Sequence, residues 1–263
     1  MTSLPPAPAA SPLPAPPLLH PDHQVAEFTV RGRAHRLLIP RGSMDDCRAI
    51  FEGREYPVGL FRHAGVTTIL DIGAHVGFAS LYFHLQFPDA CIHAFEPLAE
   101  NQDLFRANLA DVLQVRLHPH GLGAGDETRT LYLSRQFGLG ASSVVRTRDH
   151  EGESALVELR DARKTIGGLV PPGNPVSILK IDTEGFEFVV LDRLREWLPA
   201  VDVVFLEVHS ERRRRDIDRL LAPWFQLRHC EVPFGHRIKL LYLNARALQE
   251  GRVATVNAPE ILI

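Results

Sequence analysis

Four ionisable residues that could take part in catalysis follow two apolar runs, in the segments KIDTEG and LEVHS. They are Asp182, Glu184, Glu207 and His209. A reaction at a hydroxyl group is helped by a general base whose pKa lies near the working pH. His209 is the first choice for this base, because the unperturbed pKa of histidine is nearest to neutral, and Glu207 or Asp182 would orient it. A strand-end histidine without any proton-transfer role is an equally good interpretation, since the chain has 13 histidines.

The same four side chains offer oxygen and nitrogen ligands for a metal ion. Mg²⁺ is an option because it prefers carboxylate oxygens, although no ligand spacing in the sequence demands a metal. Lys180 lies inside the apolar run that precedes Asp182. A buried lysine is costly unless it is paired, so we expect Lys180 to form an ion pair with a nearby carboxylate.

A second group of residues suits a nucleoside. The segment VTTILDIGAHVG predicts a strand that ends at Asp71 and Ile72, then a turn containing Gly73 and Gly77, and Glu96 follows the next apolar run. A carboxylate in that position can accept hydrogen bonds from both ribose hydroxyls, as in dinucleotide sites. The middle glycine of the dinucleotide pattern is absent, however, which favours a ligand without a pyrophosphate.

Other interpretations of this pattern remain open. An NAD(P)-dependent oxidoreductase is disfavoured by the glycine spacing, and a plain turn whose glycines serve packing alone is the structural alternative. A non-catalytic nucleoside-binding or carrier-docking module is a third class, for which the arginine run at 212–215 is the positive feature. That run is flanked by acids, which is more typical of a solvated helix face.

The elements that must position these residues alternate between strand and helix. Alternation of this kind predicts a mostly parallel sheet covered by helices, with ligands at the carboxyl ends of the strands. The predicted core strands cover 66–72, 90–95, 115–125, 176–182 and 201–209, with a terminal pair at 225–231 and 238–245, and the helices cover 78–87, 98–113 and 185–198. Residues 130–134 and 155–161 are predicted to form an inserted β segment.

The chain divides into four parts by composition. Residues 1–22 are rich in proline and alanine and are predicted to be disordered or extended. Residues 23–62 are predicted to form a hairpin and a helix that cap the main domain, which covers 63–245, and 246–263 form a C-terminal segment.

Five motifs in order, LDIGAHVG, AFEP, LGAG, ASS and LKIDTEGFE, resemble those of the FkbM-type family of S-adenosylmethionine-dependent methyltransferases. The resemblance covers about residues 45–245. It implies an α/β class I Rossmann-like methyltransferase fold, with a seven-stranded mostly parallel sheet whose last strand, at 238–245, runs antiparallel. It also implies O-methylation of a small hydroxylated acceptor, such as a natural product or a sugar, with S-adenosylmethionine as the cofactor.

The resemblance also assigns residues to the cofactor. It places Asp71, Gly73 and Gly77 at the methionine end, Glu96 at the ribose, and Gly121 and Leu122 near the adenine. The complete predicted cofactor-binding set adds Ala74, His75, Pro97, Asn101 and Asp182. His75 stands where many members carry asparagine. Ser142 and Ser143 could hydrogen-bond ligand oxygens, although loop serines more often bond the local backbone.

Composition restricts partners and location. A net charge of −3 argues against a molecule covered by a nucleic-acid-binding surface, and the chain has no apolar run of the roughly 18 residues that a membrane helix needs. The three cysteines show no CxxC pattern, so neither a disulfide framework nor a thiolate zinc site is expected. Together with the absence of a secretory signal pattern, these features predict a cytoplasmic enzyme with a small-molecule partner. They carry no signature of the oligomeric state.

Overall fold

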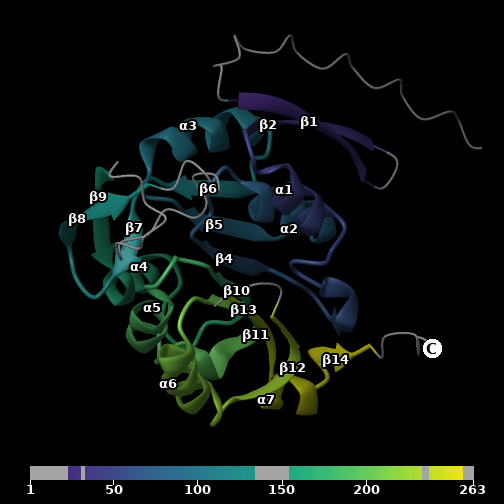
Figure 1. The fold of residues 1–263 in the computed structure, drawn as a ribbon. Helices are drawn as coiled ribbons and strands as arrows, with labels where there is room; N and C mark the ends of the chain where they lie inside the picture. The colour runs from purple at the N-terminus through teal and green to yellow at the C-terminus, as the bar shows by residue number, and fades with distance from the viewer. Residues whose placement is uncertain (1–22, 31–32, 134–153, 233–236, 257–263) are drawn as a thin grey trace, which may run out of the picture.

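A seven-stranded sheet forms the centre of the molecule (Figure 1). The computed structural model describes residues 23–30, 33–133, 154–232 and 237–256. The strand order is β12-β13-β11-β10-β4-β5-β6. The bounds are β4 Thr68–Ile72, β5 Cys91–Phe95, β6 Val115–His118, β10 Val176–Ile181, β11 Val201–Val208, β12 Phe225–Glu231 and β13 Ile238–Asn244. Only β13 runs antiparallel to its neighbours in this sheet, which confirms the predicted antiparallel last strand.

Helices cover both faces of this sheet because successive strand residues point to opposite sides. Ile69 packs into one hydrophobic cluster and the next residue, Leu70, into the other. The first cluster is covered by α1 Met44–Phe51, α2 Phe78–Gln86, α3 Ala99–Asn108 and α7 Ala245–Gln249, and the second by α4 Ala162–Leu169, α5 Glu187–Arg193 and α6 Glu211–Leu221. Two short 3₁₀ turns occupy Val58–Leu60 and Leu198–Ala200.

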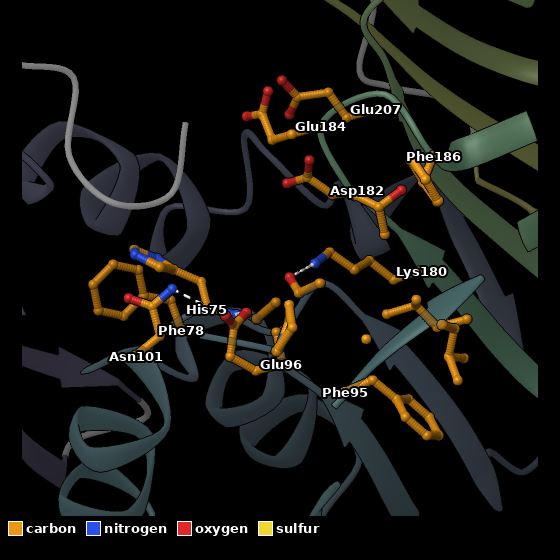
Figure 2. Close-up of a pocket in the computed structure, with 18 of the residues that line it drawn as sticks. His75, Phe78, Phe95, Glu96, Asn101, Lys180, Asp182, Glu184, Phe186 and Glu207 are labelled. Atoms are coloured by element: carbon orange, nitrogen blue, oxygen red, sulfur yellow. Dashed lines mark hydrogen bonds between the residues drawn. The ribbon is translucent and has the colours of Figure 1, made fainter. Parts of the chain in front are cut away.

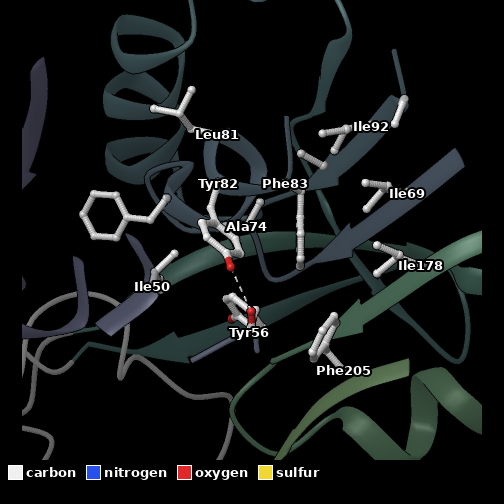
Figure 3. Close-up of a cluster of buried hydrophobic side chains, with 14 of the residues drawn as sticks. Ile50, Tyr56, Ile69, Ala74, Leu81, Tyr82, Phe83, Ile92, Ile178 and Phe205 are labelled. Carbon is white, nitrogen blue, oxygen red and sulfur yellow. Dashed lines mark hydrogen bonds between the residues drawn. The ribbon is translucent and has the colours of Figure 1, made fainter. Parts of the chain in front are cut away.

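Aromatic side chains join the first face of the sheet to the segment after α1 (Figure 3). The rings of Tyr56, Phe83 and Phe205 pack against one another, with centroids 5.3 Å apart for Tyr56 and Phe83, 5.5 Å for Tyr56 and Phe205 and 5.9 Å for Phe83 and Phe205. The Tyr82 hydroxyl donates to the carbonyl of Tyr56 over 3.1 Å. Tyr56 is therefore held from two sides by α2 and β11.

The segments around β7 and α4 differ from the sequence prediction, which also lacks β3 Phe61–His63, α7 and β14 Val253–Thr255. The single strand expected at 115–125 is divided, because the chain turns at 119–120 and places β7 Gly121–Gly123 in a separate small sheet with β9 Ser154–Asp161 and β8 Glu127–Tyr132. Helix α4 was not predicted, since Gly167 and Gly168 weaken the helical pattern. Its start is nevertheless capped by Asp161, whose side chain accepts from the Lys164 N–H over 3.0 Å.

The N-terminal hairpin is present as predicted, with β1 His23–Val30 antiparallel to β2 Arg33–Pro40. Asn108 at the end of α3 holds this hairpin: its side chain bonds the Leu38 N–H over 2.8 Å and the Leu38 carbonyl over 2.9 Å. The same amide also donates to the carbonyl of Val76 over 2.9 Å. One side chain thus connects the hairpin to the turn that follows β4.

The C-terminal segment returns to the amino end of the sheet, where β14 Val253–Thr255 pairs with β3 Phe61–His63. Asp202, which is 2% exposed, joins the two by accepting from Arg252 and contacting the His63 ring over 3.0 Å. Residues 1–22 lie outside the described ranges. None of the helices in the described ranges has the length and apolar character needed to cross a membrane.

Candidate functional site

A cleft opens at the carboxyl ends of β4, β5, β10 and β11 (Figure 2), as predicted for a sheet of this type. One end of the cleft is formed by the turns after β4 and β5 and by the small sheet. The other end is acidic and is closed by α1 and the start of β13. The first end is lined by Gly73, Ala74, His75, Phe78, Phe95, Glu96, Pro97, Asn101, Gly121, Leu122, Leu131, Val157, Leu159 and Phe186, and the acidic end by Asp46, Glu55, Tyr56, Asp182, Glu184, Glu207, Arg237 and Lys239.

The turn after β4 depends on a glycine for close packing. Gly73 has a φ of +85°, and a Cβ added there would lie 1.7 Å from the carbonyl oxygen of Asp182. This contact joins the turns after β4 and β10. Gly77 has a φ of +93°, and an added Cβ would lie 2.2 Å from the Leu109 side chain. The described residues that line the cleft include Gly73 but not Gly77.

Asp71 and Lys180 form a buried ion pair, as the sequence predicted for Lys180. Asp71 is 0% and Lys180 2% exposed, and their Oδ1 and Nζ atoms are 3.0 Å apart. The Lys180 ammonium also donates to the Gly73 carbonyl, and the Ser80 hydroxyl donates to Asp71 over 2.6 Å. Burial opposes the charge of Lys180, but the carboxylates of Asp71, Asp182 and Glu207 together outweigh it, and the pKa of Lys180 is raised. Asp71 is not among the described residues that line the cleft; it supports the Gly73 turn through Lys180.

Glu96 is held at the end of β5 by three hydrogen-bond donors. Its carboxylate accepts from the backbone N–H groups of Leu98 and His75, each over 2.9 Å, and from the Asn101 amide over 3.1 Å. The residue is 5% exposed, and burial raises the pKa of the carboxyl despite these donors. The predicted position of Glu96, in a cleft at the end of a strand, is therefore confirmed.

Two polar atoms beside Glu96 are available to a ligand. Within the described part of the chain, Nε2 of His75 and Oδ1 of Asn101 are buried and lack a hydrogen-bond partner, and both residues line the cleft. His75 has a φ of 52°, a conformation that asparagine also adopts readily. Burial, with a further effect of the Lys180 charge, lowers the pKa of His75 to about 4.

We expect the His75 imidazole to titrate near pH 4 in the folded protein, as followed by NMR. The unfolded chain takes up this proton near pH 6.5, so the contribution of His75 to stability decreases as the pH falls from about 6.5 towards 4. As the pH falls through this interval, the Tm of the wild type should fall more than the Tm of His75→Asn. A constant difference between the two, or an NMR midpoint near 6.5, would contradict the assignment.

The acidic end brings Asp182, Glu184 and Glu207 together, as Figure 2 shows. His209 lies behind these carboxylates and is not among the described residues that line the cleft. Its Nε2 is 3.1 Å from Glu184 and 3.3 Å from Glu207, and its Nδ1 is 3.0 Å from Glu187.

His209 was the first choice for the base because the unperturbed pKa of histidine is near neutral, and these contacts show that its pKa is not near neutral here. Burial alone would lower the pKa of His209, but hydrogen bonds with Glu184, Glu187 and Glu207 raise it far above the neutral range. An imidazole that already carries a proton cannot accept another. Burial and the neighbouring Glu207 charge raise the pKa of Asp182, while His209 and Arg237 overcome burial and lower the pKa of Glu207.

Several residues of the acidic end were not identified from the sequence. Glu187 belongs to the LKIDTEGFE motif, three residues after Glu184, and this spacing was the available signal. Glu55 and Lys239 form an ion pair between segments far apart in the chain, and no local pattern indicates such a contact. Arg237 contacts Glu184 over 3.4 Å.

The remaining predicted features lie elsewhere. Ser142 and Ser143 fall outside the described residues. The arginines at 212–215 lie on α6, where Arg213, Arg214 and Arg215 form ion pairs with acids of the same helix. This arrangement agrees with the interpretation of the run as a solvated helix face.

The strand order, the antiparallel β13 and the cleft at the strand ends define a class I Rossmann-like methyltransferase fold. The chain belongs to the FkbM methyltransferase family: residues 71–231 match the methyltransferase FkbM domain. In structure it is similar to the methyltransferase FkbM from Methylobacillus flagellatus KT, with a TM-score of 0.51 and 17% identity over 73% of this chain and 47% of that one.

Two curated relatives come from fungi. Methyltransferase 1 of Beauveria bassiana (strain ARSEF 2860) is 27% identical over 158 residues, which are 53% of this chain and 64% of the relative. Methyltransferase sdnD of Sordaria araneosa is 27% identical over 197 residues, covering 59% of this chain and 76% of the relative. The chain thus spans slightly less than two thirds of the Beauveria protein.

Proposed function

We propose that this protein binds S-adenosylmethionine and catalyses methyl transfer to a hydroxyl oxygen of a small molecule, such as a natural product or a sugar. The observation that carries the proposal is the buried Glu96 carboxylate at the end of β5, fixed by three donors and facing the cleft. Membership of a methyltransferase family supports the reaction class. The turn after β4 lacks the glycine that a pyrophosphate requires, which supports a single nucleoside.

The residues at the first end of the cleft fit such a cofactor. The Glu96 carboxylate is suited to bind the ribose hydroxyls, with the unpartnered oxygen of Asn101 and nitrogen of His75 beside it in the described structure. Leu122 and Leu159 supply apolar walls that suit the adenine. When it is bound, S-adenosylmethionine supplies a methyl group on a sulfonium, already activated for transfer.

The acidic end fits the acceptor. The cleft must hold the acceptor oxygen in line with the methyl group, because proximity and orientation provide much of the rate enhancement. The hydroxyl must also lose its proton. The carboxylates of Asp182, Glu184 and Glu207 line this end and are the groups that can accept it.

Replacing Glu96 with alanine should weaken S-adenosylmethionine binding roughly 10- to 100-fold, because a charge-assisted hydrogen-bond partner is lost. Calorimetric titration with S-adenosylmethionine and with NADH is the measurement, and only the first should bind to the wild type. Asp103→Ala is the matched control, since Asp103 is an acid on α3 whose side chain is 80% exposed. Unchanged affinity in a folded Glu96→Ala protein would exclude the ribose role, and tight NADH binding would exclude the proposed cofactor.

A further inference from the structure

Three potential metal-ligand atoms converge behind the acidic end of the cleft. Oδ1 of Asp182, Oε1 of Glu207 and Nε2 of His209 form a group whose ligand atoms all lie within 4.8 Å of one another. Oδ1 of Asp182 is buried and makes no hydrogen bond within the described structure, whereas Oε1 of Glu207 and Nε2 of His209 are 3.3 Å apart and form an ion pair. Glu207 is only 8% exposed. A buried carboxylate oxygen without a hydrogen bond is uncommon and costly, so this Asp182 oxygen, close to two further ligand atoms, indicates a shared partner.

The fold brings the three atoms together through neighbouring strands. Asp182 directly follows β10, while Glu207 lies at the end of β11 and His209 directly after it, and these two strands are paired in parallel. Glu207 and His209 are two positions apart on an extended chain, so their side chains leave the same face. Figure 2 shows Asp182, Glu184 and Glu207 meeting above Lys180.

The ring of His209 is oriented as in a metal-binding histidine. Its Nδ1 is 3.0 Å from Oε1 of Glu187, and Glu187 is 1% exposed and is itself fixed by the Gly185 N–H over 2.7 Å. Metal-ligating histidines commonly donate their second ring N–H to a carboxylate, which fixes the tautomer. A metal ion would displace the proton that Nε2 shares with Glu184 and Glu207 in the metal-free protein, while Nδ1–H remains bound to Glu187.

The charge at this point also favours a cation. The four carboxylates of Asp182, Glu184, Glu187 and Glu207 face the His209 imidazole and the Arg237 guanidinium. Lys239 also acts on Glu207 but is paired with Glu55. Arg237 is 3.7 Å from Glu207 and its side chain is 43% exposed, so it lies on the solvent side of the cluster. Lys180 is already paired with Asp71. A divalent ion would balance the remaining carboxylates.

We propose that Asp182, Glu207 and His209 bind a divalent transition-metal ion, with Glu187 as the residue that positions His209. Mg²⁺, the metal considered from the sequence, prefers an all-oxygen octahedral shell. An imidazole ligand beside two carboxylates suits ions such as Mn²⁺ or Zn²⁺ better. The ion would lie beside the acceptor end of the cleft, where it could anchor the acceptor oxygen. This last role rests on the proposed function, whereas binding of the ion does not.

The test is direct binding of Mn²⁺ to the full-length protein after dialysis against EDTA, without cofactor or acceptor. Electron paramagnetic resonance of free Mn²⁺ should show one bound ion per chain, displaced by Zn²⁺ more effectively than by Mg²⁺. His209→Gln and Asp182→Asn should bind Mn²⁺ at least about 100-fold more weakly, and Glu187→Gln roughly 10- to 100-fold more weakly. Asp46→Asn is the matched control, because Asp46 is an acid of the same cleft outside the ligand set.

The outcomes separate this inference from the proposed function. Stoichiometric Mn²⁺ binding that depends on His209 supports the site even if no methyl transfer is found. The site would be overturned if the protein binds neither Mn²⁺ nor Zn²⁺. It would also be overturned if folded His209→Gln and Asp182→Asn proteins bind Mn²⁺ as tightly as the wild type. Methyl transfer in the presence of EDTA would leave the proposed function standing in either case. A site that prefers Mg²⁺ to Mn²⁺ would overturn the imidazole ligand.

Discussion

Replacing Lys180 with methionine is expected to lower the free energy of unfolding by about 3–5 kcal/mol, because it leaves the Asp71 carboxylate buried without its counter-ion. Asp71 is 0% exposed, so water cannot take the place of the lost ammonium. The substitution also removes the donor to the Gly73 carbonyl. Urea denaturation followed by circular dichroism measures the loss.

The double variant Asp71→Asn/Lys180→Met is the control for this explanation. Removing both charges should recover part of the lost stability, since the amide introduced at position 71 is neutral and can still bond to Ser80. If the double variant is as unstable as Lys180→Met alone, the loss comes from packing. A loss below about 1 kcal/mol in Lys180→Met would show that the pair is not buried as described.

Gly73→Ala is expected to cost more than about 3 kcal/mol, whereas Gly42→Ala should cost about 1–2 kcal/mol. The two glycines have nearly the same φ, +85° and +88°, so both substitutions strain the backbone alike. A Cβ at Gly42 has no atom within 4 Å in the described structure, but a Cβ at Gly73 would lie 1.7 Å from the Asp182 carbonyl oxygen. Comparing the two variants by urea denaturation isolates the contact between the turns.

The contact at Gly73 also joins the two ends of the cleft, so Gly73→Ala should weaken S-adenosylmethionine binding as well as stability. Gly42→Ala, at a turn before α1 and outside the cleft lining, should bind the cofactor like the wild type. Equal loss of stability in both variants would mean that the turns after β4 and β10 do not touch, and that Gly73 is required only for its φ.

Local patterns were enough to predict the core strands β4, β5, β10 and β11, the cleft at their ends and the pairing of Lys180. The β-branched run before Asp71 and the apolar run before Asp182 indicated buried parallel strands, and burial alone required a partner for the lysine. The position of Glu96 in the cleft could be predicted because it depends on the end of one strand. These features are set by residues close together in the sequence or by a general cost of burial.

The properties of His209 could not be predicted in the same way. Its pKa depends on Glu184 in the loop after β10 and on Glu187 at the start of α5, as well as on Glu207. The motif also suggested that Asp71 contacts the cofactor, whereas its two oxygens are used by Ser80 and Lys180. Such effects arise from tertiary neighbours, and the sequence does not show which neighbour a polar side chain meets.

The three bonds of Asn108 have an evolutionary consequence. One amide holds both Leu38 of the hairpin and Val76 of the turn after β4. A change at position 108 would therefore affect both segments. Because these bonds go to backbone atoms, the side chains at positions 38 and 76 can vary while the side chain at position 108 cannot. A chimera that takes its hairpin from one relative and its strand-end turn from another would need a compatible residue at position 108.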